Sequence, residues 1–131
     1  RLRAMAAELG VESRVHFAGS VDHDLLPLIL SAADAMVLPT VSEGLANVWV
    51  EALACGTPVV TCDVGAASEL VASDLAGQLI ERSAAGVVAG VRKVLSQQRD
   101  RQAVSALVAG YSWEANAADL ADHYAALAER R

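Results

Sequence analysis

The sequence predicts an α/β fold in which a parallel β-sheet is flanked by helices, as in one half of a Rossmann-like domain. Short apolar runs of strand length alternate along the chain with longer Ala- and Leu-rich segments of helical length. Strands that alternate with helices pair in parallel through right-handed crossovers. Of the 131 residues, 54% are hydrophobic but only 4% are aromatic, so the core is expected to consist of Ala, Val and Leu.

The first third of the chain is expected to contain two helices and two strands. Apolar residues recur at helical spacing over residues 1–9, and Gly10 is suited to end that helix. Two short apolar runs are typical of buried strands and span residues 15–18 and 35–38. Between them, residues 22–33 are predicted to form a helix whose first residue, an aspartate, is the N-cap. Its buried side is predicted to carry Leu25, Leu26, Ile29 and Leu30.

The remaining chain continues this alternation of helices and strands. Helices are predicted at residues 45–54, 84–98, 100–110 and 112–130, and strands at residues 58–62 and 77–80. A loop and a short helix are expected at residues 65–71. Ser112 is positioned to cap the last helix, whose packed face is predicted to carry Leu120, Tyr124 and Leu127. The whole chain, residues 1–131, is therefore expected to be one domain that the helix at 112–130 closes.

The most informative segment, residues 39–60, leads from a predicted strand into a predicted helix. The first backbone N–H groups of a helix have no internal partners and lie at the positive end of its dipole. A phosphate group is therefore expected to bind at the start of this helix, over Gly44, Leu45, Ala46 and Asn47. Because glycine has no Cβ, Gly44 would let a ligand approach the backbone closely.

Two glutamates, Glu43 and Glu51, extend this candidate site. Glu51 is the only charged side chain from residue 44 to residue 62, so in its apolar helix it is expected to be buried and to need a partner. Helical side chains lean toward the N-terminus, so Glu51 would point toward the phosphate. With a helix start near Leu45, the two glutamates would lie about 12 Å apart along the axis, at ~1.5 Å per residue. One elongated ligand would then contact both.

At these residues the sequence resembles the retaining, nucleotide-sugar-dependent glycosyltransferases of the GT-B fold, known as group 1 or family 4. The resemblance consists of a glutamate, seven residues, and then Glu-Ala-Leu-Ala-Cys-Gly-Thr-Pro-Val-Val from Glu51 onward. It continues in residues 15–19, 33–40 and 64–69 and in the aromatic motif at 111–113. It implies that the chain is the C-terminal, donor-binding domain, and that a missing N-terminal domain carries the acceptor site.

The resemblance also implies a role for each candidate residue. Glu43 matches the catalytic first glutamate of the family, which contacts the transferred sugar near the reacting carbon. Glu51 matches the second, which binds the ribose hydroxyls. The donor phosphates would lie on Gly44, Leu45, Ala46 and Asn47. Ala46 stands where many family members have glycine, so it adds a methyl group beside the phosphate. The family implies no obligatory metal ion or other cofactor.

Charge and hydropathy exclude several other classes of protein. The net charge of −6 argues against a nucleic-acid-binding surface. None of the ten Lys and Arg residues lies between residues 15 and 81, so a diphosphate at this site would meet only backbone donors. By resemblance, the missing cations come from an earlier part of the same domain. No run is long enough to span a membrane and no signal peptide opens the chain, which favours a cytoplasmic protein. The resemblance still allows the complete protein to associate with a membrane.

The function predicted from the sequence is transfer of a sugar from a nucleotide-sugar donor to an acceptor, with retention of the anomeric configuration. The chain would bind the donor and would be inactive alone, since it begins at Arg1 without a Met and is expected to belong to a longer protein. Two alternatives stay open. One is a nucleotide-sugar epimerase of the same fold, and the other is a non-catalytic domain that binds a nucleotide or pairs with another chain.

Overall fold

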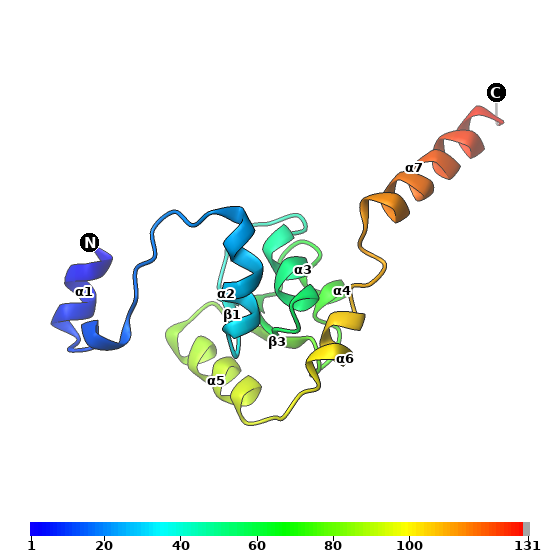
Figure 1. Cartoon of the computed structure of the whole chain (residues 1–131). Helices are drawn as coiled ribbons and strands as arrows, with labels where there is room; N and C mark the ends of the chain where they lie inside the picture. Colours follow the sequence, from blue (N-terminus) through cyan, green and yellow to red (C-terminus); the bar gives the residue numbers. More distant parts are fainter. Residues whose placement is uncertain (130–131) are drawn as a thin grey trace.

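The structure is a computed structural model that describes residues 1–129, and its centre is a three-stranded parallel sheet (Figure 1). The strands are β1 (Met36–Leu38), β2 (Val59–Cys62) and β3 (Gly77–Ile80), paired in the order β1-β2-β3. In the register of the sheet, Val59 lies opposite Met36 on one side and Gly77 on the other. These strands confirm the α/β fold and the strands predicted at 35–38, 58–62 and 77–80.

Helices follow each of the three strands, as the alternating pattern predicts. The α-helices are α1 (Leu2–Glu8), α2 (Leu26–Ala32), α3 (Asn47–Ala54), α4 (Ala67–Leu70), α5 (Ala84–Leu95), α6 (Arg101–Ala106) and α7 (Trp113–Ala128), with 3₁₀ turns η1 (Glu12–Arg14) and η2 (His23–Leu25). As predicted, the Asp22 side chain accepts a hydrogen bond at the start of η2 and the Ser112 hydroxyl caps α7. None of the helices within residues 1–129 combines the length and the apolarity needed to cross a membrane.

The core surrounds β2, whose four residues are all buried. Successive strand residues face opposite sides of a sheet. On one side, Val59 belongs to the main apolar cluster with Trp49 of α3 and Val104 of α6. On the other side, α5 packs closely, because a Cβ at Gly90 would lie 2.9 Å from the Val60 side chain. Helices therefore cover both faces of the sheet, and the loops at its carboxyl edge are left open.

Residues 15–18 do not form the predicted strand. They run as an extended connection between α1 and the rest of the molecule, and α1 itself lies apart from the sheet (Figure 1). The Phe17 ring packs under the Arg3 guanidinium, with 4.7 Å between Arg3 Cζ and the ring centroid. An apolar run becomes a strand only where a neighbouring strand accepts its hydrogen bonds, and the described sheet ends at β1.

Two helices expose faces that were predicted to be packed. Leu120, Tyr124 and Leu127 of α7 are exposed, and no residue within Trp113–Ala128 is buried. Figure 1 shows α7 projecting away from the sheet. On the segment 22–32, Leu30 is buried and Leu26 packs against the core, but Leu25 and Ile29 are exposed. An apolar stripe indicates which face of a helix can pack, but not whether a neighbour is present. The predicted end of α7, residue 130, lies outside the described residues.

Candidate functional site

The candidate site lies at the carboxyl edge of the sheet, where the loops after β1 and β2 meet. The Ala66 N–H donates to the Gly44 carbonyl oxygen at 2.8 Å, which ties the second loop to the first. Just below, the Thr61 hydroxyl donates to the Leu38 carbonyl oxygen at 2.8 Å and holds the two strand ends together. These contacts bring both loops together on one rim, at the edge where parallel α/β sheets bind ligands.

Gly65 makes this close approach of the two loops possible. Its φ is +55°, a left-handed conformation that favours glycine. A Cβ at this position would lie 2.1 Å from the Gly44 carbonyl oxygen and 2.2 Å from the Glu43 carbonyl oxygen. No other residue fits without moving one of the loops. The sequence places residues 65–69 on the same rim as Glu43, because they follow a predicted strand, but it does not single out Gly65 as a site residue.

The Glu43 side chain is exposed in the loop after β1 and is oriented by a threonine. The Thr40 hydroxyl donates to Glu43 Oε1 at 3.2 Å and lies 3.4 Å from the Ser42 carbonyl oxygen. Among the described residues, no group donates to Glu43 Oε2, so that oxygen is open to a ligand. Thr40 was not predicted as a site residue, since a hydroxyl three residues before a glutamate is an unspecific pattern.

Helix α3 begins at Asn47, two residues later than the predicted start. Its N-cap, Ala46, has an extended backbone (φ −73°, ψ 115°), and no side chain among residues 1–129 caps the helix. The N–H groups of Asn47 and Val48 are therefore its first unsatisfied donors. Leu and Ala favour helix, but the Gly44 carbonyl is engaged by the second loop, and this tertiary contact delays the helix. Gly44, Leu45 and Ala46 consequently lie in the loop, and the 12 Å separation calculated for one continuous helix does not apply.

Glu51 is half-buried, whereas the sequence predicts a buried side chain. The buried face of α3 is made by Trp49, Ala52 and Leu53, and Glu51 lies beside this face. The apolar residues around it on the helix, such as Val48, are themselves only partly covered. In the described part of the chain, no hydrogen-bond donor contacts the Glu51 carboxylate. A half-buried carboxylate without a protein partner is available to bind the hydroxyls of a ligand.

Two arginines, Arg99 and Arg101, contact segments at the opposite, amino-terminal edge of the sheet. Arg101 Nη2 donates to the Ser31 carbonyl oxygen at 2.5 Å and to Thr57 Oγ1 at 3.0 Å. Arg99 Nη2 donates to the Asp74 carbonyl oxygen at 2.9 Å. These contacts join helix ends and loops that precede the strands. The contacts of these two guanidinium groups are therefore made on the side of the sheet away from the candidate site.

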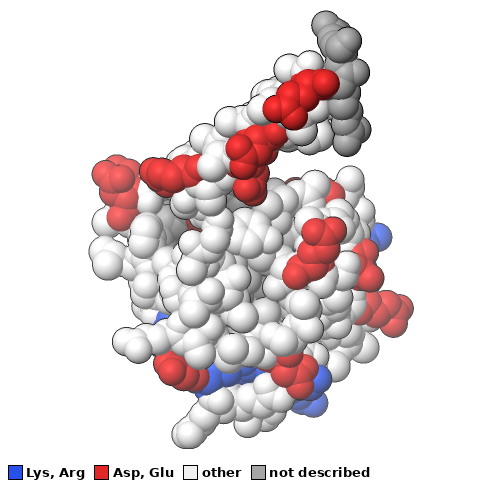
Figure 2. Space-filling model, turned by 90° about the vertical axis from the view of Figure 1, so that its right-hand side faces the viewer, with Lys and Arg blue, Asp and Glu red and all other residues white. Residues whose placement is uncertain are grey.

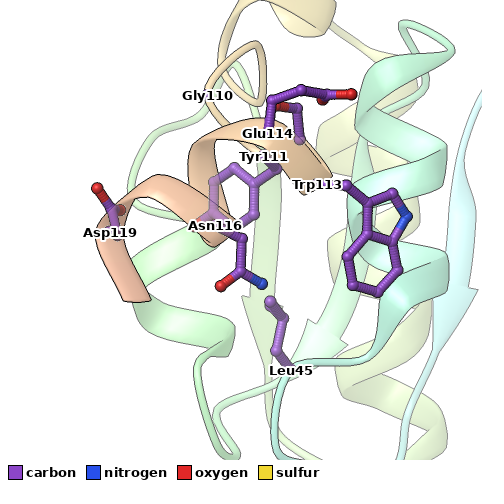
Figure 3. A pocket seen from close by; sticks show the side chains of 8 residues that line it. Leu45, Gly110, Tyr111, Trp113, Glu114, Asn116 and Asp119 are labelled. Carbon is purple, nitrogen blue, oxygen red and sulfur yellow. The ribbon is translucent and has the colours of Figure 1, made fainter. Parts of the chain in front are cut away.

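A cavity of about 590 Å³ adjoins the candidate loop at Leu45 (Figure 3). It is lined by Leu45, Gly110, Tyr111, Ser112, Trp113, Glu114, Asn116 and Asp119. Figure 3 shows the Asn116 amide pointing toward Leu45, with Trp113 at the right of the view. Of the predicted site residues, only Leu45 contributes to this cavity. The lining residues from α7 were not predicted to belong to a site, because the sequence analysis used the motif at 111–113 only to identify the family.

Comparison with known proteins assigns the family. Residues 1–109 match the family described as "Glycosyl transferases group 1". A D-inositol 3-phosphate glycosyltransferase from Geodermatophilus obscurus is 37% identical over 131 residues, which cover 98% of this chain and 29% of that protein. A glycogen synthase from Mycobacterium tuberculosis is 38% identical over 116 residues, which cover 84% of this chain and 28% of that protein.

A solved structure shows the same relationship. Sucrose-phosphate synthase from Thermosynechococcus elongatus superimposes with a TM-score of 0.79 and 30% sequence identity, covering 100% of this chain and 34% of that one. The chain thus spans less than a third of the length of the two relatives named above. The resemblance found in the sequence is confirmed: this chain belongs to the group 1 glycosyltransferases and has the fold of a GT-B C-terminal domain.

Proposed function

We propose that this chain binds the nucleotide-sugar donor of a glycosyltransferase that acts with retention of the anomeric configuration. The observation that carries the proposal is the start of α3, where the uncapped N–H groups of Asn47 and Val48 follow a loop fixed by the Ala66–Gly44 hydrogen bond. Such a terminus offers backbone donors and the positive end of a dipole to a phosphate. The relatives named above support transfer rather than epimerisation, because they carry the names of sugar transferases and synthases.

Each candidate residue has a role in this proposal. The donor diphosphate lies over Gly44, Leu45, Ala46 and Asn47, Glu51 accepts hydrogen bonds from the ribose hydroxyls, and Glu43 contacts the transferred sugar. When the bond to the anomeric carbon breaks, negative charge grows on the leaving diphosphate. Preorganised N–H groups stabilise such charge without reorganising during the reaction. The proposal therefore assigns this stabilisation to the α3 terminus rather than to a metal ion.

The proposed reaction needs groups outside this chain. An acceptor hydroxyl must be held at the anomeric carbon and water must be kept away from it. We assign both tasks to a second domain of a longer protein, in keeping with the fraction of its relatives that this chain spans. We also expect that protein to supply Lys or Arg side chains to the diphosphate, because residues 15–81 contain neither.

Glu51→Gln in the complete enzyme tests the donor site. The substitution removes the charge but not the size of the side chain, so the dissociation constant of the donor should rise about tenfold as a charged hydrogen bond becomes a neutral one. The melting temperature should not change, because the carboxylate has no partner in the described residues. Calorimetric titration and thermal denaturation measure the two quantities.

The matched control is Glu8→Gln, which alters an exposed glutamate on α1, away from the sheet (Figure 1). It should leave donor affinity unchanged. If Glu51→Gln instead lowered the melting temperature strongly and left donor affinity intact, Glu51 would serve the fold and the proposed ribose contact would be wrong.

A further inference from the structure

We infer that parallel strands from outside residues 1–131 extend the sheet of the complete enzyme from the free edge of β1 to residues 15–18. Within the described sheet, β1 is an end strand that pairs with β2 alone. Residues 15–18 are extended but belong to no strand of that sheet. Two segments of this chain therefore lack a pairing partner, and the same added strands would serve both. The inference goes beyond the proposed function, because it holds for any ligand at the carboxyl edge.

The backbone of β1 presents hydrogen-bonding groups at this free edge. The Met36 N–H donates to the Pro58 carbonyl oxygen at 2.9 Å, so the backbone polar groups of Met36 face β2. In a parallel sheet, successive residues of a strand direct their N–H and C=O groups to opposite sides. The N–H and C=O groups of Val37 therefore face the free edge. Such a pair of groups is a template on which a further strand adds.

The two end strands of the sheet differ in how they are protected. Natural edge strands are blunted by charged side chains or by proline. The run at residues 35–38 is entirely apolar, and Pro39 comes only after β1. At the start of β3, by contrast, Lys93 Nζ lies 2.9 Å from Asp74 Oδ1, and Gln78 Nε2 donates to the same oxygen at 2.7 Å. The composition of β1 is therefore that of an interior strand, and the surroundings of β3 are those of an edge strand.

Side chains in both unpaired segments are left partly exposed. Val37 lies opposite Val60 in the register of the sheet, so the two side chains share one face. Val60 is fully buried under α5, whereas Val37 is 40% exposed. In the other segment, Val15 is 41% exposed. Apolar strands placed between the two segments would remove both side chains from water, which favours an uncharged occupant.

The occupant that fits is chain from the same longer protein. A parallel connection needs a dozen or more residues, and residues 19–35 are long enough for residues 15–18 to reach the edge of β1. They do not occupy it, and Figure 1 shows them apart from the sheet. Helix α7 is exposed too, but a helix with acidic side chains along it does not pair with a strand (Figure 2). This chain spans 29% and 28% of two relatives, so a protein of their length has chain to supply the strands.

A second copy of this chain fits the edge less well. A two-fold axis would pair β1 with its own copy in an antiparallel arrangement. Residues 15–18 would then still lack a partner. Added parallel strands instead continue the pairing that β1 already makes with β2, and they give both unpaired segments a neighbour.

Amide hydrogen exchange, measured by mass spectrometry at residue resolution, tests the inference by comparing this chain with the complete enzyme. The Val37 amide should exchange about a hundredfold more slowly in the complete enzyme, because an interior strand opens far less often than an edge. Exchange should also slow within residues 15–18. The matched control is Leu79. The Ala76 carbonyl oxygen accepts from the Val59 N–H of β2, so by the same alternation the Leu79 N–H faces the free edge of β3 and should exchange equally fast in both proteins.

Three results would overturn the inference. The first is an equal rate of exchange at Val37 in both proteins. The second is a slowing at Leu79 as large as that at Val37, since the protection would then be general. The third is unchanged exchange within residues 15–18, because the added strands would not reach that segment. The measurement needs no bound donor, so a failure of donor binding counts against the proposed function alone.

Val37→Lys gives a second, independent test. In this chain the side chain is partly exposed, so the melting temperature should change little. In the complete enzyme the lysine would lie inside the extended sheet, and the melting temperature should fall by about 5 °C. The matched control is Val88→Lys, which alters a 47% exposed valine of α5 and should be neutral in both proteins. An equal effect of Val37→Lys in the two proteins would contradict the added strands.

Discussion

Glu43→Ala is expected to reduce the turnover of the complete glycosyltransferase by about 10²–10³-fold, the usual cost of removing one group that stabilises transition-state charge. Glu43 lies in the loop after β1, where the Thr40 hydroxyl donates to Oε1 and no group among the described residues donates to Oε2. In the proposed pose it contacts the transferred sugar and not the nucleotide. Affinity for the free nucleoside diphosphate should therefore be almost unchanged, which steady-state kinetics and calorimetry measure together.

Thr40→Val is the companion variant, because it keeps Glu43 and removes the hydroxyl that orients it. It should lower turnover by a smaller factor, about tenfold, since the carboxylate remains but loses one neutral hydrogen bond. If affinity for the free nucleotide fell as steeply as turnover in Glu43→Ala, the glutamate would be a nucleotide-binding residue. The proposed orientation of the donor would then be reversed.

Gly65→Ala is expected to have the largest effect on stability and to abolish donor binding with it. The added methyl group must displace the backbone of Glu43 or Gly44, because it would lie within 2.2 Å of both carbonyl oxygens. Left-handed strain of about 1–2 kcal/mol and overpacking of about 1–3 kcal/mol add up to a loss on the order of 10 °C in melting temperature. Thermal denaturation and donor titration measure the two effects.

Gly10→Ala separates the strain from the collision. Gly10 has a similar backbone conformation, with φ +64°, but nothing lies within 4 Å of an added Cβ. This variant should lose only the smaller, strain-related part of the stability and should bind the donor normally. If Gly65→Ala and Gly10→Ala lost the same amount of stability and of donor affinity, the contact between the two loops would contribute nothing to the site.

Hydrophobic periodicity predicted the fold well where both partners of a contact lie within the chain. The runs at 35–38, 58–62 and 77–80 became β1, β2 and β3 because each has a neighbouring strand and a helix to cover it. The same kind of pattern failed at residues 15–18, which have no neighbouring strand in the described sheet. It also failed on α7, whose apolar stripe is exposed. Hydrophobic periodicity indicates which face of a helix or strand can be buried. Whether another element covers that face depends on the tertiary structure.

The candidate site was predicted in outline, and its details depend on contacts between distant segments. Glu43 and Glu51 were identified from one local motif. The structure places Glu43 in the loop at the carboxyl edge of the sheet and Glu51 on α3, the helix that follows this loop. Thr40 and Gly65 act through a side-chain contact and a close backbone approach that no spacing rule describes. The later start of α3 has the same origin, because a hydrogen bond from Ala66 competes with the local preference for helix.

The most direct test of the central claim is an NMR titration of the isotope-labelled chain with the diphosphate-glucose derivatives of uridine, guanosine and adenosine. The largest amide shifts should occur at Gly44, Asn47, Val48 and Ala66. Affinity should be weaker than micromolar, because a helix terminus contributes up to about 2 kcal/mol whereas a micromolar complex needs roughly 8 kcal/mol. Unchanged amides at the start of α3, with shifts confined to the opposite edge of the sheet around Arg99 and Arg101, would contradict a donor site at this helix.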